Sequence, residues 1–249
     1  MADPIYYERP VLLDRERHRR RRVKAASGFA FARKAHSVVL AAVEFGEASK
    51  EYAIVFTRSS AGKVVPVVLL GLRGGENLFV DDQEHWDARY IPAFVRRYPF
   101  VLAQLPGQAS LAVCVDEAFP GWNVAEGEPL FDEQGQDTPF LRNALDFLGQ
   151  YQREHLRTEA FCAHLEEAGV LKEMNAGANL ADGRAFTVDG LLVVDEAKLL
   201  ALPDATVLSW FRSGELHLAY LHLASLSNLQ RLVDRIALRN SPMPPAPQP

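Results

Sequence analysis

The sequence contains little of what would mark a secreted or membrane-spanning protein. Only two of its 249 residues are cysteine, so a disulfide framework is excluded. We expect Cys114 and Cys162 to be reduced thiols that pack as small apolar side chains. No window reaches the roughly 18 apolar residues that a membrane helix needs, and the N-terminus has no apolar signal segment. These absences predict a cytoplasmic protein, with export by a C-terminally directed route left open.

Motifs for catalysis and cofactor binding are missing too. The patterns HExxH, CxxC, GxSxG, GxGxxG and the P-loop do not occur. His217 and His222 are five residues apart, whereas two metal ligands on one helical face need a spacing of three or four. The acidic segment 116–137 does not follow the order of an EF-hand loop. We therefore predict no cofactor and no metal site.

What is present is the composition of an ordinary folded protein, with 48% hydrophobic and 24% charged residues. The net charge of −5 is unevenly distributed. Residues 1–34 carry ten basic and four acidic side chains, a balance of +6, so the remainder carries −11. The cluster Arg19–Arg22 either pairs with the acidic segment 116–137, which has no Lys or Arg, or meets an external partner. The net negative charge disfavours a nucleic-acid partner, and we predict none.

Apolar, β-branched runs indicate strands in the first half of the chain. We expect strands at 53–56, 64–70, 100–105 and 110–115, the last two as a hairpin around Pro106-Gly107. Pro66 indicates an edge strand or a bulge, because proline cannot donate to a neighbouring strand. A short helix is expected at 91–98.

The second half has mainly helical spacing. Thr138 is a suitable N-cap before Pro139, and helical spacing continues to Gly169 as one bent helix or two. The other expected elements are a β-hairpin of 178–181 with 184–188 turning at Asp182-Gly183, a third strand at 191–194, Asp-capped helices at 195–202 and 204–212, and a last helix at 215–238. That last helix is apolar over most of its circumference, which is typical of a position inside the domain or in an oligomer interface.

These patterns predict an α+β protein with a mixed or antiparallel sheet in its N-terminal half and a helical C-terminal half that includes a small β-hairpin. We expect a single domain over residues 1–240, sheet-rich over 1–135 and helix-rich over 136–240. The proline-rich segment 241–249 is expected to be an extended tail.

Three groups of residues are candidates for a functional site. The segment Trp86–Phe100 combines arginine and aromatic side chains, which dominate binding hot spots. Asp116 and Glu117 end a predicted strand, and His222 and Ser225 share one helical face. Either these residues form a binding surface, or some of them converge in a catalytic cleft. The candidate binding residues are Asn77, Trp86, Tyr90, Arg96, Arg97, Asp116, Glu117, His222 and Ser225.

Several of these segments together resemble the bacterial SapC family, which is named for a surface-layer gene region and is distinct from the similarly named peptide-transport permease. The segments are Gly71-Leu72, Glu76–Phe79, Trp86, Tyr90–Ala93, Arg96–Phe100, Glu126–Asp132 and His222–Leu226. The resemblance runs from about Ile5 to Leu238, and it departs from a common Tyr-Pro-Ile-Val-Phe pattern at Ala53. It brings no established catalytic residues with it.

The resemblance implies a link to surface layers or, through gene neighbourhoods with outer-membrane receptors and halogenase-like enzymes, to nutrient handling. Our leading hypothesis is a non-enzymatic binding or accessory protein of the bacterial envelope or uptake machinery, with a protein partner. Homo-oligomerisation through the last helix is a further expectation. The alternative is an enzyme of unknown reaction with its acid–base groups near Asp116 and Glu117 or near His222 and Ser225.

Overall fold

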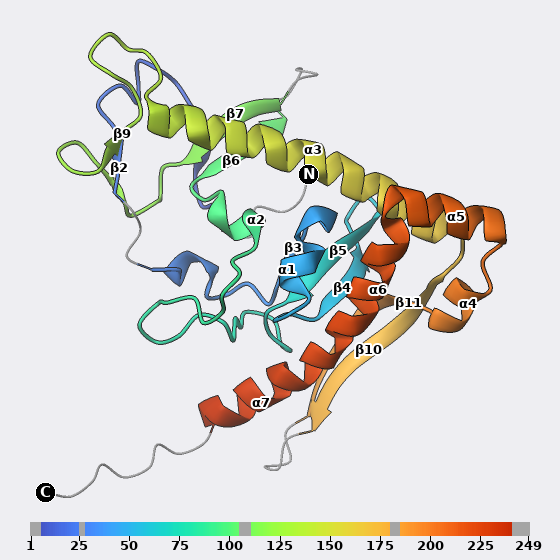
Figure 1. The fold of residues 1–249 in the computed structure, drawn as a ribbon. Coiled ribbons are helices and arrows are strands. Elements are labelled where there is room, and N and C mark those ends of the chain that lie inside the picture. The colour runs from blue at the N-terminus through green and yellow to red at the C-terminus, as the bar shows by residue number, and fades with distance from the viewer. Residues whose placement is uncertain (1–5, 25–27, 105–110, 180–184, 241–249) are drawn as a thin grey trace, which may run out of the picture.

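The structure is a computed structural model that describes residues 6–24, 28–104, 111–179 and 185–240 (Figure 1). Its strands are β1 (Pro10–Leu12), β2 (Arg22–Val23), β3 (Ser37–Val39), β4 (Ile54–Arg58), β5 (Val64–Leu69), β6 (Phe100–Gln104), β7 (Leu111–Asp116), β8 (Trp122–Asn123), β9 (Glu128–Pro129), β10 (Leu171–Asn179) and β11 (Ala185–Val194). Its helices are α1 (Phe45–Ala48), α2 (Ala93–Arg96), α3 (Pro139–Glu167), α4 (Glu196–Leu200), α5 (Asp204–Ser213), α6 (Glu215–Ser225) and α7 (Leu229–Asn240), with 3₁₀ turns η1 (Ala30–Ala32), η2 (Ala42–Glu44) and η3 (Leu226–Asn228). The predicted α+β class and the helical second half are confirmed.

The largest sheet has five antiparallel strands in the order β10-β11-β4-β5-β3. Strand β4 is buried on both faces, since Ile54, Val55 and Phe56 all have 0% exposure. Phe56 contacts Phe161 of α3 and His222 of α6, so both helices meet over this strand. A continuous apolar run is what such a doubly covered strand requires.

Pro66 does not mark an edge strand or a bulge, so that prediction is wrong. Strand β5 lies between β4 and β3, and neither pairing shifts in register. Pro66 is opposite Phe56, and its carbonyl accepts a hydrogen bond from the Leu40 N–H at 3.0 Å. Because β3 ends at Val39, proline removes a bond only where the neighbouring strand has already ended.

Two three-stranded sheets, β1-β7-β6 and β8-β2-β9, form the rest of the β structure. They bring the basic N-terminal segment onto the acidic segment 116–137. The contacts are the ion pairs Arg15–Asp137 (3.2 Å), Arg17–Glu117 (2.5 Å) and Lys24–Glu126 (2.6 Å), and a hydrogen bond from Arg19 to the Glu133 carbonyl (2.9 Å). Within the cluster Arg19–Arg22, Arg19 and Arg22 both donate to backbone carbonyls of the acidic segment, so internal pairing is observed for these two arginines.

The start of α3 confirms the capping prediction, because Thr138 Oγ1 accepts a hydrogen bond from the Leu141 N–H at 3.2 Å. The helix is a single element as far as Glu167, and Gly169 follows it with φ +64°. The predicted hairpin is longer than expected: β10 begins at Leu171, and the third strand expected at 191–194 is the end of β11. Its turn, at 182–183, lies outside the described residues.

Among the shorter helices, α2 covers only Ala93–Arg96, so the helix expected at 91–98 is shorter than predicted. Asp195 caps α4 by accepting from the Ala197 N–H at 3.1 Å, as expected. Asp204 does not cap α5, because it lies in the first turn and Pro203 occupies the N-cap position.

The last predicted helix is interrupted. It runs as α6, the 3₁₀ turn η3 and α7, and its buried side consists of Ala219, His222, Ser225, Asn228, Leu232 and Ile236. Of the two expectations for this helix, packing inside the protein is therefore observed, and oligomerisation stays a prediction. The proline-rich segment lies outside the described residues.

Two hydrophobic cores result, and α3 contributes to both. The larger core surrounds the five-stranded sheet and includes Phe161 and Leu165 of α3. The smaller core consists of Val23, Phe100, Val115, Phe119, Leu130, Phe131, Leu141 and Leu148. Tyr98 packs against both cores. The candidate site lies beside Tyr98, between these two cores.

Candidate functional site

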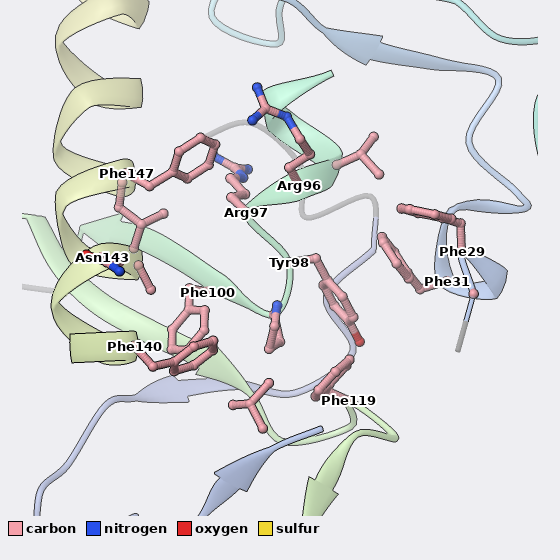
Figure 2. Close-up of a pocket in the computed structure, with 16 residues that line it drawn as sticks. Phe29, Phe31, Arg96, Arg97, Tyr98, Phe100, Phe119, Phe140, Asn143 and Phe147 are labelled. Carbon is pink, nitrogen blue, oxygen red and sulfur yellow. The ribbon is translucent and has the colours of Figure 1, made fainter. Parts of the chain in front are cut away.

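A cavity of about 520 Å³ opens between the two cores (Figure 2). Its lining residues are Val23, Gly28, Phe29, Phe31, Val95, Arg96, Arg97, Tyr98, Pro99, Phe100, Phe119, Phe140, Asn143, Ala144, Phe147 and Leu148. Six of these are phenylalanines, and the polar side chains are few. A concave, mostly apolar site of this size is typical of small-molecule binding.

Helical periodicity explains the wall that α3 contributes. Phe140, Asn143, Ala144 and Phe147 recur at spacings of three and four, so they share one face of α3. The opposite wall is the segment from α2 to β6, which presents Arg96–Phe100. Figure 2 shows the side chains from these two segments facing each other across the cavity.

Aromatic contacts hold the remaining wall in place. The rings of Phe31 and Tyr98 stack with their centroids 4.2 Å apart, and Tyr98 meets Phe119 edge to face at 5.5 Å. Such contacts contribute roughly 0.5–1.5 kcal/mol beyond area burial. Phe29, Phe31 and Tyr98 are only half-buried, which leaves part of each ring accessible from the cavity.

Arg96 and Arg97 lie at the end of the cavity near Phe147, and Phe119 lies at the opposite end (Figure 2). Arg96 donates from Nε to the Ile91 carbonyl at 2.9 Å, and its guanidinium carbon lies 5.2 Å from the Phe147 ring centroid. Arg97 packs over the ring of Phe94 at 4.0 Å. These two cations are the charged groups of the cavity wall.

The other aromatic candidates have structural partners. Trp86 is 8% exposed and donates from its indole nitrogen to the Tyr52 hydroxyl at 2.8 Å. Tyr90 donates to a carboxylate oxygen of Glu44 at 2.7 Å and lies under the Arg96 guanidinium. Asn77 is fully buried and donates to the Ala32 carbonyl at 3.0 Å.

Asp116 and Glu117 have internal partners as well. Asp116 is fully buried, and its carboxylate accepts hydrogen bonds from the backbone N–H groups of Glu8, Arg9 and Ala118, each at 2.9 Å. Glu117 pairs with Arg17 at 2.5 Å. The Asp116 carboxylate therefore anchors the N-terminal segment to the end of β7.

The side chains of His222 and Ser225 form hydrogen bonds with backbone groups of the five-stranded sheet. Leu192 of β11 is paired with Phe56 of β4, which places Val194 opposite Ile54. At that position the imidazole of His222 bridges the strands: Nε2 accepts from the Val194 N–H at 3.0 Å, and Nδ1 donates to the Ile54 carbonyl at 2.9 Å. Ser225 Oγ accepts from the Ile54 N–H at 3.0 Å. Both side chains are fully buried.

This arrangement makes stability dependent on pH. Burial lowers the pKa of His222 from 6.5 to about 4 in the folded protein. Below pH 6.5 the unfolded chain therefore binds a proton that the folded chain does not, so this residue's stabilisation is complete above pH 6.5 and is lost as the pH falls toward 4. The expected loss is about 3 kcal/mol in the free energy of unfolding.

Urea unfolding at about pH 7 and about pH 4.5 measures this dependence. His222→Gln should show a smaller decrease between the two pH values than the wild type. His217, exposed on the same helix, provides the control, since His217→Gln should keep the wild-type decrease. Equal pH dependence in the wild type and in His222→Gln would contradict the assignment.

The structure therefore brings Arg96 and Arg97 together at one cavity, with Tyr90 beside Arg96. Asp116 and His222 lie in separate hydrogen-bonded clusters with different partners. The residues that sequence reasoning missed are Phe29, Phe31, Phe119, Phe140, Asn143 and Phe147. The spacing of Phe140, Asn143 and Phe147 places them on one helical face, and this pattern in the sequence could have indicated the α3 wall of the cavity.

The described residues contain no group of three or more His, Cys, Asp or Glu side chains that could hold a metal ion. In the same part of the chain, no helix combines the length and apolarity needed to cross a bilayer.

The model of the SapC family matches residues 13–232, which is most of the chain. The chain belongs to the SapC family. No curated protein and no solved structure matches it. In this SapC chain, Arg96–Phe100, one of the segments that carry the resemblance, forms one wall of the cavity.

Proposed function

We propose that this SapC protein is a non-enzymatic binding protein that takes an apolar ligand into the cavity between its two cores, as an accessory to the bacterial envelope or to nutrient uptake. The observation that carries the proposal is the aromatic lining of a cavity of about 520 Å³. Ligand sites of roughly 300–1,000 Å³ take drug-sized molecules. Burial of about 200 Å² of apolar ligand surface there would contribute roughly 5 kcal/mol before the entropic cost of association.

The internal partners of the acid–base candidates support binding over catalysis. An acid or base needs access to a substrate atom, whereas Asp116, His222 and Ser225 are each 0% exposed. Their polar atoms bind groups of the protein itself, mainly backbone, and Asp116 also accepts a hydrogen bond from the Tyr98 hydroxyl at 3.4 Å. None of the three lines the cavity.

A neutral fluorescent probe, N-phenyl-1-naphthylamine, tests the cavity directly, because it becomes bright in apolar surroundings. We expect saturable binding to the wild type. Phe147→Ala should weaken the affinity about tenfold, since it removes a ring from the wall and tenfold corresponds to about 1.4 kcal/mol.

The matched control is Phe211→Ala on α5, which removes the same side chain from a position that is 72% exposed and outside the cavity. It should bind the probe as the wild type does. Ala144→Phe fills the cavity from the α3 face and should abolish binding in a protein that remains folded by circular dichroism. Probe binding unaffected by both cavity variants would refute the proposal.

The accessory role adds a protein partner, and we propose that the partner contacts the arginine-bearing end of the cavity. Proteins that co-purify with the wild type should be lost with the double variant Arg96→Gln/Arg97→Gln. The control is a chain with Arg157→Gln, because Arg157 is exposed on α3 and pairs locally with Glu154. Unchanged partner binding by the folded double variant would contradict this part of the proposal.

A further inference from the structure

Arg97 has aromatic rings around its guanidinium where an acidic partner would be expected. Its guanidinium carbon lies 4.0 Å from the ring centroid of Phe94, 5.1 Å from that of Tyr151 and 5.9 Å from that of Tyr7. Its Nε is buried and has no hydrogen-bond partner among the described residues. The arginine ion pairs found in the described part of the chain involve other arginines.

The phenols near Arg97 do not supply a compensating negative charge. Burial raises the pKa of Tyr7 to about 12, although the charge of the Arg97 guanidinium and its hydrogen bond to the phenol act in the opposite direction. Burial also raises the pKa values of Tyr6 and Tyr151. All three hydroxyls are therefore neutral at physiological pH. The Tyr6 hydroxyl is a second buried group with no hydrogen-bond partner in the described part of the chain.

Glu44, one of the buried acids of the protein, is occupied by other donors. One of its carboxylate oxygens accepts from the Tyr90 hydroxyl and the Ala93 N–H, both at 2.7 Å. The other accepts from the Ala41 N–H at 2.9 Å. Glu44 thus keeps its hydrogen bonds within the protein, and among the described residues Arg97 forms no ion pair with an acidic side chain.

A cation that is partly removed from water favours an anionic partner, because its own hydration has been reduced. Cation–π contacts offset only part of that loss. Arg96, whose guanidinium lies over Phe147, adds a second positive charge at the same end of the cavity. Guanidinium groups bind carboxylate and sulfonate oxygens through strong, directed hydrogen bonds.

We propose that the ligand of this cavity is an amphipathic acid: an apolar or aromatic body that lies among the phenylalanines, with one anionic head group held by Arg97 and assisted by Arg96. This inference rests on the proposed binding function and specifies its ligand class. It requires charge complementarity at one end of the cavity and apolar contact along the rest.

Two probes with the same ring system test the head group. N-Phenyl-1-naphthylamine is neutral, and 8-anilinonaphthalene-1-sulfonate carries one negative charge on the same rings. We expect the wild type to bind the anionic probe about tenfold more tightly. Arg97→Gln should remove that preference, so that the two probes bind with about equal affinity, because one charge-assisted contact accounts for a difference of this size.

Matched variants separate charge from structure. Arg157→Gln changes the net charge equally at an exposed site and should keep the preference for the anion. Arg97→Lys retains the positive charge without the planar guanidinium, so it should keep part of the preference for the anionic probe. Phe140→Ala should weaken both probes alike, because it removes an apolar ring of the cavity wall that packs on Phe100. An Arg97→Gln variant that keeps the tenfold preference would overturn the assignment.

A competition measured on the wild type alone covers the case in which Arg97→Gln fails to fold. Decanoate should displace the neutral probe at about one tenth of the concentration that decan-1-ol requires, and salt should reduce that advantage. Equal displacement by the acid and the alcohol would refute the anionic head group and leave the cavity as a binding site. Failure of both probes to bind would instead refute the proposed function itself.

Discussion

Replacement of His222 with alanine should lower the free energy of unfolding by about 4 kcal/mol. The substitution leaves the Val194 N–H buried without its partner, and leaves the Ile54 carbonyl only the long contact from the Ser225 hydroxyl at 3.5 Å. A buried group without a partner costs roughly 1–3 kcal/mol. It also leaves a cavity under Phe56, whose ring centroid lies 4.9 Å from that of the imidazole. Urea-induced unfolding followed by far-UV circular dichroism gives the number.

His217→Ala is the control for this prediction, because His217 is exposed on the same helix and should change stability by less than about 0.5 kcal/mol. His222→Gln can both donate and accept, so it should fall between the wild type and His222→Ala. A His222→Ala protein as stable as the wild type would show that the imidazole does not bridge the strands. The catalytic alternative for His222 would then regain support.

Replacement of Asp116 with alanine should have a comparable effect, a loss of about 4 kcal/mol. The carboxylate accepts three backbone hydrogen bonds at 2.9 Å, and bonds to a charged group contribute roughly 1.5–3 kcal/mol each. Some of that loss is recovered, because the N–H groups of Glu8 and Arg9 are only partly buried and can bind water. Urea-induced unfolding measures the net decrease in the free energy of unfolding.

Two neighbouring substitutions serve as controls for Asp116. Asp116→Asn keeps one carbonyl oxygen as an acceptor, so about half of the loss is expected. Glu117→Gln removes an adjacent acid that pairs with Arg17 near the surface, and the loss should stay below about 1 kcal/mol. Equal losses for Glu117→Gln and Asp116→Ala would show that local charge, not the anchoring of the N-terminal segment, sets the stability.

Local signals predicted most of the fold. The β-branched residues of β4 and β5, and the Thr138-Pro139 start of α3, act through their own backbone preferences, so each could be recognised without knowing its neighbours. Pro66 was misinterpreted because its tolerance depends on where β3 ends, which is a property of a different strand. The break at η3 in the last helix was missed, since the apolar spacing continues across it.

The site was predicted only in part. Arg96 and Arg97 were recognised from the local mixture of arginine and aromatic residues. The phenylalanine lining was not, because Phe29, Phe119 and Phe147 come from separate segments that only the folded chain brings together. Asp116 and His222 were ambiguous for another reason. The sequence pattern of a buried polar residue in an apolar run is the same whether its partner is a substrate or the protein backbone.

The two cysteine thiols, Cys114 and Cys162, lie in different halves of the molecule. Cys162 is 1% exposed in the larger core, and Cys114 is 3% exposed on β7 next to Val115 of the smaller core. Burial raises the pKa of both, to about 12 for Cys162, so neither can be alkylated while it is packed. Each thiol is therefore a built-in reporter of local opening, and comparison of their labelling rates distinguishes one cooperative unit from two that unfold separately.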